Sequence, residues 1–287
     1  MRVRVPASSA NLGPGFDTLA IALNLYTEVE VVLADRFTVE TKGFGSEVAV
    51  DSDHLCAQIA REVLGHDNVA VKVSSEIPLS RGLGSSAALA VATAAACGAY
   101  DAFVVASELE GHCENAAASY FGGLVVGTKI DERYEARQLS IDPAIVAIVI
   151  VPEVRLATKE LRAVLPTTIP FGDAVANLGR LALAIASFSD VSQLEVALSQ
   201  DLLHERYREE VFPDARGLKE LLIEAGAVYS CWSGAGSTVI GLFDRREARR
   251  ALGVVQSGLT AFTFGATAQM LEVDHDGMVI FEDEADE

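Results

Sequence analysis

The segment from Pro78 to Ala88, with the sequence Pro-Leu-Ser-Arg-Gly-Leu-Gly-Ser-Ser-Ala-Ala, constrains the fold more than any other part of the chain. It follows an alternating apolar run at 69–75, which predicts a strand, and it begins an apolar run at 87–96, which predicts a buried helix. Glycines let the backbone approach a ligand and adopt positive φ angles. Backbone N–H groups at a helix start bind phosphate, so the segment predicts a phosphate site between a strand and a helix.

The local sequence leaves two interpretations of this segment open. The common phosphate loop has the pattern G-x-x-x-x-G-K-[ST], and its lysine is absent here. Ser85 and Ser86 can offer a hydroxyl to a metal ion that accompanies the phosphate. The alternative is a glycine turn before a core helix that these serines cap.

Three motifs resemble the GHMP small-molecule kinases, which phosphorylate galactose, homoserine, mevalonate and phosphomevalonate. The segment 78–88 is similar to their ATP-binding signature. The run at 5–17, Val-Pro-Ala-Ser-Ser-Ala-Asn-Leu-Gly-Pro-Gly-Phe-Asp, resembles the homoserine kinases more than other members of the family. The run at 233–238, Ser-Gly-Ala-Gly-Ser-Thr, is similar to the C-terminal glycine-rich motif. The three motifs stand in the family's order over most of the chain.

The resemblance implies an ATP- and Mg²⁺-dependent kinase that converts L-homoserine to O-phospho-L-homoserine in threonine biosynthesis. It implies an α+β fold with two domains: residues 1–142, similar to domain 2 of ribosomal protein S5, and residues 143–287, with a ferredoxin-like fold. Two other functions stay open. One is a GHMP kinase for a sugar or a mevalonate-type acid, and the other is a ligand-binding relative without catalysis.

The resemblance also indicates which residues bind the nucleotide and the metal. Ser86 and Glu110 match the Mg²⁺ ligands of the family, with Glu108 as the alternative to Glu110. Two or three oxygen ligands, completed by phosphate and water, suit Mg²⁺. The residues implied to bind ATP are Pro78, Leu79, Ser80, Arg81, Gly82, Leu83, Gly84, Ser85, Ser86, Ala87 and Ala88.

A homoserine substrate carries an ammonium group, which requires an oxygen acceptor, and a carboxylate, which favours arginine. By resemblance, Asn11, Asp17, Arg180 and Arg208 line its pocket, with Arg208 preferred over Arg206. Two alternatives remain. Asn11 and Asp17 can form an ordinary Asx turn in the Gly-Pro-Gly loop, and Arg180 can be a helix residue whose charged end reaches solvent.

The run His112-Cys113-Glu114-Asn115 departs from the His-Pro-Asp-Asn that is usual in homoserine kinases. The resemblance implies that His112 and Asn115 hold the substrate and its hydroxyl and act in catalysis together with Arg180. Asn115 cannot accept a proton. We therefore expect catalysis by positioning and charge stabilisation, with the hydroxyl proton leaving late to phosphate or water. Glu114 is the second choice, as a base.

Charge and cysteine content limit the partners and the compartment. The net charge of −19 and the pI near 4.6 argue against nucleic acid and anionic membranes as partners. Four cysteines without a C-x-x-C pair suit a reducing cytosol and predict neither a zinc site nor a disulfide framework. The N-terminus lacks the apolar segment of a signal peptide. We expect a cytoplasmic protein with small-molecule partners, and a homodimer stays open.

Hydrophobic periodicity predicts mixed strands and helices in both halves, in two-layer domains. The unbroken apolar run at 144–151 predicts a strand buried on both faces. The run at 87–106 is broken by Gly98 and Asp101, which indicates a buried helix and its exit rather than a membrane span. The acidic tail at 282–287 is expected to be disordered. Further predicted strands are 3–7, 26–33, 37–41, 124–130, 227–232, 238–243, 260–264 and 268–273, and further helices are 53–64, 114–119, 158–164, 173–186, 215–224 and 245–252.

Overall fold

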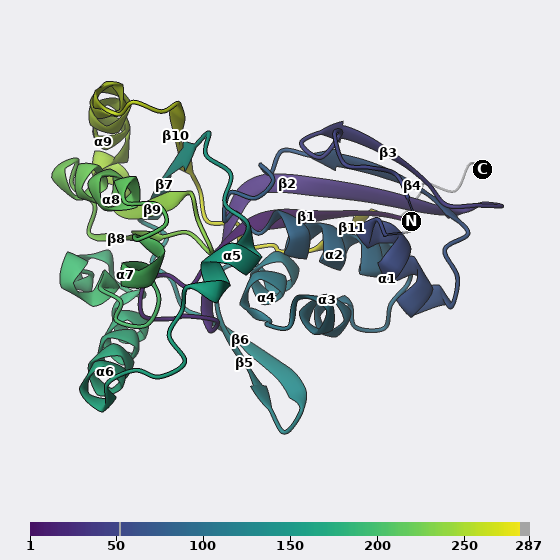
Figure 1. Ribbon diagram of the computed structural model, residues 1–287, viewed down its shortest axis with the longest axis horizontal. Coiled ribbons are helices and arrows are strands. Elements are labelled where there is room, and N and C mark those ends of the chain that lie inside the picture. The colour runs from purple at the N-terminus through teal and green to yellow at the C-terminus, as the bar shows by residue number, and fades with distance from the viewer. Residues whose placement is uncertain (52, 282–287) are drawn as a thin grey trace.

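The computed structural model describes residues 1–51 and 53–281, and the acidic tail lies outside them. Two β-sheets with packed helices form two lobes (Figure 1). The strands are β1 (Arg2–Ala10), β2 (Leu19–Leu33), β3 (Thr38–Gly43), β4 (Val69–Ser75), β5 (Leu124–Ile130), β6 (Arg133–Leu139), β7 (Ile145–Pro152), β8 (Tyr229–Trp232), β9 (Val239–Asp244), β10 (Ala266–Leu271) and β11 (Val279–Phe281). The helices are α1 (Leu55–Leu64), α2 (Ser85–Ala96), α3 (Ala102–Glu110), α4 (Glu114–Phe121), α5 (Thr158–Ala163), α6 (Phe171–Ser187), α7 (Glu205–Arg208), α8 (Asp214–Glu224) and α9 (Arg245–Gly258).

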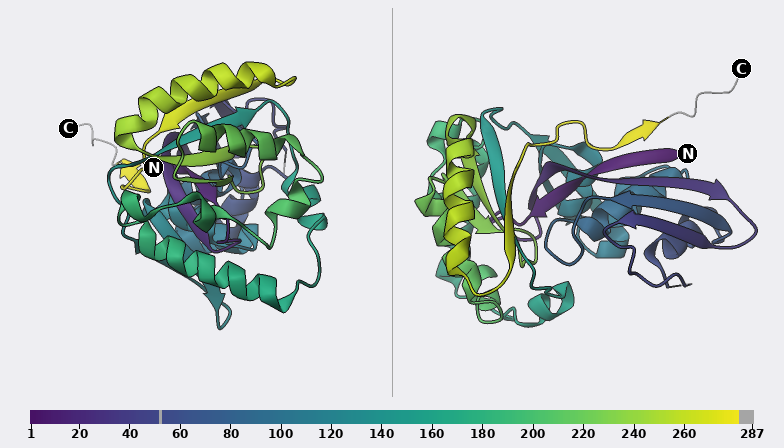
Figure 2. Two further views of the ribbon diagram at one scale, coloured as in Figure 1. Left: turned by 90° about the vertical axis from the view of Figure 1, so that its left-hand side faces the viewer. Right: turned by 90° about the horizontal axis from the view of Figure 1, so that it is seen from above.

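The first sheet has the order β11-β1-β2-β4-β3, and the ribbon β5-β6 joins it along β2. The β3–β4 pair is parallel, and the other pairs are antiparallel. Helices α1 to α4 cover one face of this sheet (Figure 1). Figure 2 shows the end of the chain crossing back from the second lobe, where β11 pairs with β1.

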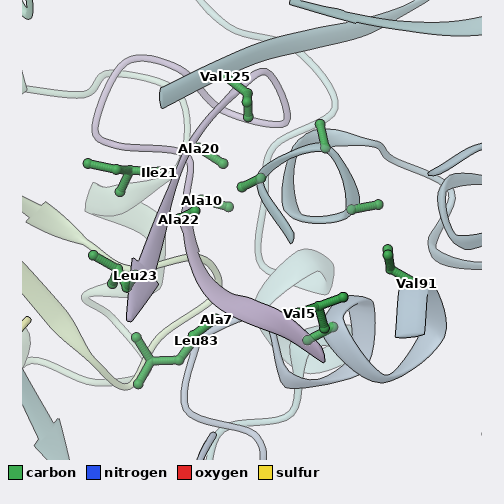
Figure 3. Close-up of a cluster of buried hydrophobic side chains, with 14 of the residues drawn as sticks. Val5, Ala7, Ala10, Ala20, Ile21, Ala22, Leu23, Leu83, Val91 and Val125 are labelled. Atoms are coloured by element: carbon green, nitrogen blue, oxygen red, sulfur yellow. The ribbon is translucent and has the colours of Figure 1, made fainter. Parts of the chain in front are cut away.

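The core of the first lobe lies between this sheet and the alanine-rich helix α2. Nine of the residues of α2 are buried, and eight of these are alanine or valine. Such small side chains let the helix approach the sheet closely, which places the start of α2 beside β1. Figure 3 shows Val5 of β1 and Val91 of α2 among the buried side chains of this core.

The second sheet is antiparallel in the order β10-β7-β9-β8, with α8 and α9 packed against it. This is the strand order of the ferredoxin-like fold. In this chain α5, α6, α7 and α8 all lie in the connection between β7 and β8. Among the described residues, no helix is both long and apolar enough to cross a membrane.

Strand β7 is buried on both faces, as predicted from its apolar run. Ala147 and Val149 belong to the core shared with the first lobe, while Val146, Ile148 and Ile150 belong to the core under α8 and α9. Full burial of a Val or Ile side chain stabilises the fold by roughly 1.5–3 kcal/mol. The strand therefore joins the two cores of the molecule.

The sequence-based prediction differs from the structure in a few segments. The predicted strand at 260–264 is wrong: a 3₁₀ turn occupies Leu259–Ala261, and Phe262 and Phe264 pack ring to ring with their centroids 5.6 Å apart. Residues with high β-propensity fit many half-buried surfaces, not sheets alone. Helices α3 and α7 and strands β6 and β11 were not predicted, while each other predicted element overlaps one of the same type.

Candidate active site

The glycine-rich segment forms the connection from β4 to α2 that its sequence predicts. Gly82 and Gly84 have φ angles of 76° and 68°. A Cβ atom on Gly82 would overlap the carbonyl oxygen of Ser233, and one on Gly84 would overlap the hydroxyl of Ser8. Gly84 is the N-cap of α2, and no side chain caps the helix. The serines therefore leave the first N–H groups of α2 free for an anionic ligand.

Two other motifs hold this loop in place. The Ser233 hydroxyl donates to the carbonyl oxygen of Gly82 (2.7 Å), and the Thr238 N–H donates to that of Arg81 (3.2 Å). From β1, the Ser8 N–H donates to the carbonyl oxygen of Leu83 (3.2 Å). The turn between β8 and β9 thus supports the loop and also reaches the cavity in front of it.

That cavity, of about 160 Å³, lies between the loop and the second lobe. It brings together most of the residues expected at the site, but not Arg180, Leu79 or Ala88. Its lining consists of Ala10, Asn11, Asp17, Pro78, Ser80, Arg81, Gly82, Leu83, Gly84, Ser85, Ser86, Ala87, Glu110, His112, Glu114, Asn115, Thr158, Arg162, Arg208, Gly234 and Ala235.

Ser86 and Glu110 meet at one end of the cavity. The Ser86 hydroxyl donates a short hydrogen bond to Oε1 of Glu110. Glu110 is the last residue of α3, which ends at Gly111 in the left-handed conformation and so turns the chain towards His112. A hydroxyl and a carboxylate beside free backbone N–H groups are the oxygen donors that fit Mg²⁺ bound to phosphate. Glu108 is exposed and does not line the cavity.

The loop after β1 carries Asn11 and Asp17 in strained backbone conformations, with φ angles of 71° and 50°. The Asn11 side chain accepts from the Asp17 N–H (3.0 Å) and donates to the carbonyl oxygen of Gly234 (2.8 Å). Asn11 therefore holds the loop and ties it to the β8–β9 turn, and it also lines the cavity. The Asp17 carboxylate is left to face the cavity.

Arg162 of α5 is the partner of Asp17, and the sequence analysis missed it. Its Nη2 and Nη1 donate to the two carboxylate oxygens of Asp17 at 2.7 and 2.8 Å. Its guanidinium also lies over the Phe16 ring, 5.6 Å from the centroid. Arg180 of α6, predicted at the pocket, does not line it. A single arginine in a short helix gave no signal, because only the fold places α5 above the N-terminal loop.

Arg208 of α7 also lines the cavity and is almost completely buried, with 1% of its surface exposed. Its Nη1 donates to the carbonyl oxygen of Gly234 (2.9 Å), while its buried Nε has no partner within the described residues. Burial, and then the neighbouring Arg162 charge, lower the pKa of Arg208 to about 10. A buried donor without a partner is costly, so this guanidinium is poised for an acceptor such as a carboxylate.

His204 is fully buried and contacts the guanidinium of Arg208. Its Nε2 lies 3.1 Å from the carbonyl oxygen of Gly13, and its Nδ1 lies 3.1 Å from Nη1 of Arg208. A guanidinium only donates and a carbonyl only accepts, so the neutral ring carries its proton on Nε2. Burial lowers the pKa of His204 to about 4, against the opposing charge of Asp201. The ring thereby links Arg208 to the N-terminal loop.

His112, Glu114 and Asn115 form the floor of the cavity at the start of α4. Nδ1 of His112 lies 3.0 Å from Oε1 of Glu114, and Asn115 donates to the same carboxylate (3.1 Å) and accepts from the Ser8 hydroxyl (2.9 Å). Burial lowers the pKa of His112, but the contact with Glu114 outweighs it, and the pKa is raised overall. The buried Oε2 of Glu114 has no partner within the described part of the chain.

Comparisons with known proteins agree with this architecture. The sequence model of the GHMP kinases N terminal domain matches residues 53–123, and that of the GHMP kinases C terminal matches residues 181–260. The chain is 33% identical to a homoserine kinase of Desulfitobacterium hafniense, over 98% of this chain and 99% of the relative. It is 35% identical to one of Lactobacillus acidophilus, over 98% and 100%.

A solved structure is similar over the same length. The crystal structure of a homoserine kinase from Cytophaga hutchinsonii superposes with a TM-score of 0.86 at 27% identity, covering 98% of this chain and 97% of that one. The resemblance inferred from three motifs, and the two-lobed α+β fold that it implied, are thus confirmed. The chain belongs to the GHMP kinase family.

Proposed function

We propose that this chain transfers the γ-phosphoryl group of ATP to the hydroxyl of L-homoserine, giving the O-phospho-L-homoserine used in threonine synthesis. The observation that carries the proposal is one cavity with two chemically different walls: free backbone N–H groups at the start of α2, and the guanidinium groups of Arg162 and Arg208, which line the same cavity. The curated relatives named homoserine kinase support the choice of acceptor.

The second wall suits a zwitterion. The unpartnered Nε of Arg208 is a donor for the substrate carboxylate. Arg162 and Asp17 are hydrogen-bonded to each other, so both can contact the same substrate molecule. Asp17 then accepts from the substrate ammonium while it stays paired with Arg162. A neutral sugar would offer no carboxylate to the buried Nε of Arg208, and a buried donor without a partner is costly.

The first wall suits the nucleotide. Ser86 and Glu110 would hold Mg²⁺, which offsets the negative charge of the phosphates when it is bound. Behind the loop, a second cavity of about 90 Å³ adjoins Ser85 and is lined largely by apolar side chains, including Phe44, Val48, Leu55 and Leu79. We assign the nucleobase to this cavity, since a flat heterocycle fits a largely apolar cavity next to the phosphate loop.

The floor of the cavity positions the attacking hydroxyl. The Asn115 amide is fixed by Ser8 and Glu114 and cannot take a proton, and His112 carries a raised pKa. A protonated His112 adds positive charge on the side of the cavity where phosphate charge develops. The hydroxyl proton leaves late, to phosphate or water, and Glu114 is the second choice as an acceptor.

The test is an assay of ADP release from Mg-ATP with homoserine, threonine, mevalonate and galactose, with the product identified by mass spectrometry. Turnover with homoserine, giving O-phosphohomoserine, is the expected result. Turnover with galactose or mevalonate alone would identify a different GHMP kinase. Binding of ATP without turnover of any of the four would contradict the proposal and favour a ligand-binding role.

A further inference from the structure

A cluster of charged side chains is buried between α7 and α8 in the second lobe (Figure 1). Glu205 of α7 is only 4% exposed, and its Oε2 lies 2.5 Å from Nζ of Lys219 in α8, whose side chain is 17% exposed. Glu209, four residues after Glu205, also reaches this ammonium group, with its Oε1 at 3.0 Å. None of these three residues lines the active-site cavity, and the phosphotransfer steps described above give them no part.

Stability alone does not explain why this contact is charged. Removing two charges from water costs about as much as their attraction returns, so apolar side chains of the same volume often serve a buried contact equally well. Hydrogen-bonded charges differ from apolar side chains because they fix individual atoms in one geometry. The pair of Glu205 and Lys219 is therefore suited to hold a group whose position matters, and Arg208 lies three residues after Glu205 in the same helix.

Helix α7 depends on such contacts because it contains only four residues, Glu205–Arg208. A single helical turn is not stable by itself in water, so contacts with the rest of the chain must fix its position. At its start, Oδ2 of Asp201 accepts from the backbone N–H groups of His204 (2.6 Å) and Glu205 (2.8 Å). The pair with Lys219 ties the turn to α8, which packs on β8 and β9.

The other carboxylate oxygen of Glu205 is bound to the strand that ends at the cavity. Its Oε1 accepts from the backbone N–H of Trp232 (2.8 Å), the last residue of β8. Two residues later, the carbonyl oxygen of Gly234 accepts from Nη1 of Arg208 (2.9 Å). One carboxylate thus holds both the helix that carries Arg208 and the strand end beside the turn that receives its guanidinium.

We propose that the pair of Glu205 and Lys219 positions Arg208 for the carboxylate of the acceptor, and thereby sets the preference for an acceptor that carries one. This inference rests on the proposed function, in which Arg208 binds that carboxylate. Both residues of the pair lie outside the cavity lining, so they are positioning residues. Without Lys219, the Glu205 carboxylate would lose its nearest opposite charge, and a buried charge without a partner is costly. Helix α7 would then shift, and Nε of Arg208 would lose the orientation that an acceptor carboxylate requires.

The first test compares two acceptors in Lys219→Met, whose new side chain has a similar length and no charge. Homoserine carries the carboxylate, while 3-aminopropan-1-ol has the same hydroxyl and ammonium groups without it. We expect the KM for homoserine to rise ~10-fold or more, with a smaller change in kcat, while kcat/KM for the amino alcohol changes less than ~3-fold. The preference for homoserine therefore falls, whereas a general loss of structure would lower the turnover of both acceptors alike.

Two further variants separate the pair from its surroundings. Arg216→Met is the matched control, because Arg216 also lies in α8 and pairs with Glu209 (2.8 Å), but its side chain is 69% exposed. It should leave the KM for homoserine unchanged, since exposed ion pairs contribute little. Lys219→Arg keeps the charge, so its KM for homoserine should lie closer to the wild type than that of Lys219→Met.

A double-mutant cycle tests whether the pair acts through Arg208. In an Arg208→Met background, Lys219→Met should lower kcat/KM for homoserine by less than ~2-fold further, because the group that it positions is gone. The cycle uses homoserine alone, so it decides the question even where turnover of the amino alcohol is too slow to measure. Glu205→Gln/Lys219→Met serves where the single Lys219 variant does not fold. The new amide still accepts from the Trp232 N–H and leaves no unpaired charge at this position, and the same loss of preference is expected.

Two results would overturn the inference: an unchanged KM and preference for homoserine in folded Lys219→Met, or losses from Lys219→Met and Arg208→Met that add. Both results require a wild type that phosphorylates homoserine, so they are distinct from a failure of the proposed function. A wild type without turnover of homoserine would contradict that function and this inference together.

Discussion

The two walls of the active-site cavity are built from different parts of the chain. The phosphate wall is backbone, supplied by the single segment 78–88, and its shape depends on atoms that are absent at Gly82 and Gly84. The opposite wall is made of side chains from three distant segments, with Asp17, Arg162 and Arg208 brought together by the fold. The backbone wall is formed by one continuous segment, so it can be recognised as a sequence motif, and an added Cβ atom at its glycines should abolish most of the activity. The side-chain wall is formed by residues far apart in the sequence, so no motif reveals it, and substituting one of its residues should lower the activity only in part.

Gly82→Ala should therefore have the largest effect. The added Cβ would overlap the Ser233 carbonyl oxygen and crowd Gly236, so the loop would have to move away from the β8–β9 turn. We expect kcat/KM to fall by ~1,000-fold or more, with weaker binding of Mg-ATP. Steady-state kinetics and calorimetric titration of ATP measure the two effects.

Gly98→Ala is the matched control for this substitution. Gly98 has a φ angle of 83°, close to the 76° of Gly82, but a Cβ on it would meet nothing within 4 Å. It should cost about 1–2 kcal/mol of stability through backbone strain and leave turnover nearly unchanged. Equal losses of activity in the two variants would show that positive φ alone, not the tight fit of the loop, makes Gly82 necessary.

Glu110→Gln should have the next largest effect. The amide keeps the size of the side chain and can accept from Ser86, but it loses the charge that would hold Mg²⁺. We expect kcat/KM to fall by ~100-fold and the Mg²⁺ concentration needed for half-maximal rate to rise. Glu108 lies two residues before Glu110 in the same helix and is exposed, so Glu108→Gln should behave as the wild type. The reverse order of the two variants would move the metal to Glu108.

The difference between the walls also explains what could be predicted from the sequence. The loop, its strand and its helix are neighbours in the chain, so local periodicity and glycine spacing were sufficient to predict them. Strand β7 was predicted as doubly buried because its composition alone reports burial on both faces. The fold class followed from three motifs in order.

Arg162 could not be predicted, because none of the three motifs recognised in the sequence includes it. Its position depends on how α5 folds over the loop that ends at Asp17, which is a contact between residues far apart in the chain. Arg180 was selected instead because it resembles the family arginine that contacts substrate, but it is not among the residues that line the cavity. Helix α3 had a local signal that was overlooked: the Asp101 side chain accepts from the Val104 N–H (3.1 Å) and caps the helix.

Arg162→Ala tests the side-chain wall and should have a smaller effect than the loop variants. Arg208 would still bind the substrate carboxylate, so we expect the KM for homoserine to rise by ~10- to 100-fold with a smaller change in kcat. Arg180→Ala is the comparison and should leave this KM within a few-fold of the wild type. A larger rise in KM for Arg180→Ala than for Arg162→Ala would restore the prediction made from the sequence.

His204 tests how the two walls are held together, and its effect is the smallest because it acts on stability alone. Its pKa in the folded chain is about 4, below the usual 6.5, because burial disfavours the charged ring. Between these values the unfolded chain binds a proton that the folded chain does not, so stability falls as the pH drops from 6.5 towards 4. From pH 7 to pH 5 the loss is on the order of 1–2 kcal/mol.

His204→Gln should remove this contribution. A glutamine can donate to the Gly13 carbonyl oxygen and accept from Arg208, as the neutral ring does, but it does not titrate. Melting curves at pH 7 and pH 5 should therefore show a smaller loss of stability for the variant than for the wild type. His112 has a raised pKa and contributes with the opposite sign, but it is present in both chains and cancels in the comparison. Parallel pH dependence in the two proteins would mean that His204 is already protonated when folded, and that Arg208 is held by something other than a neutral imidazole.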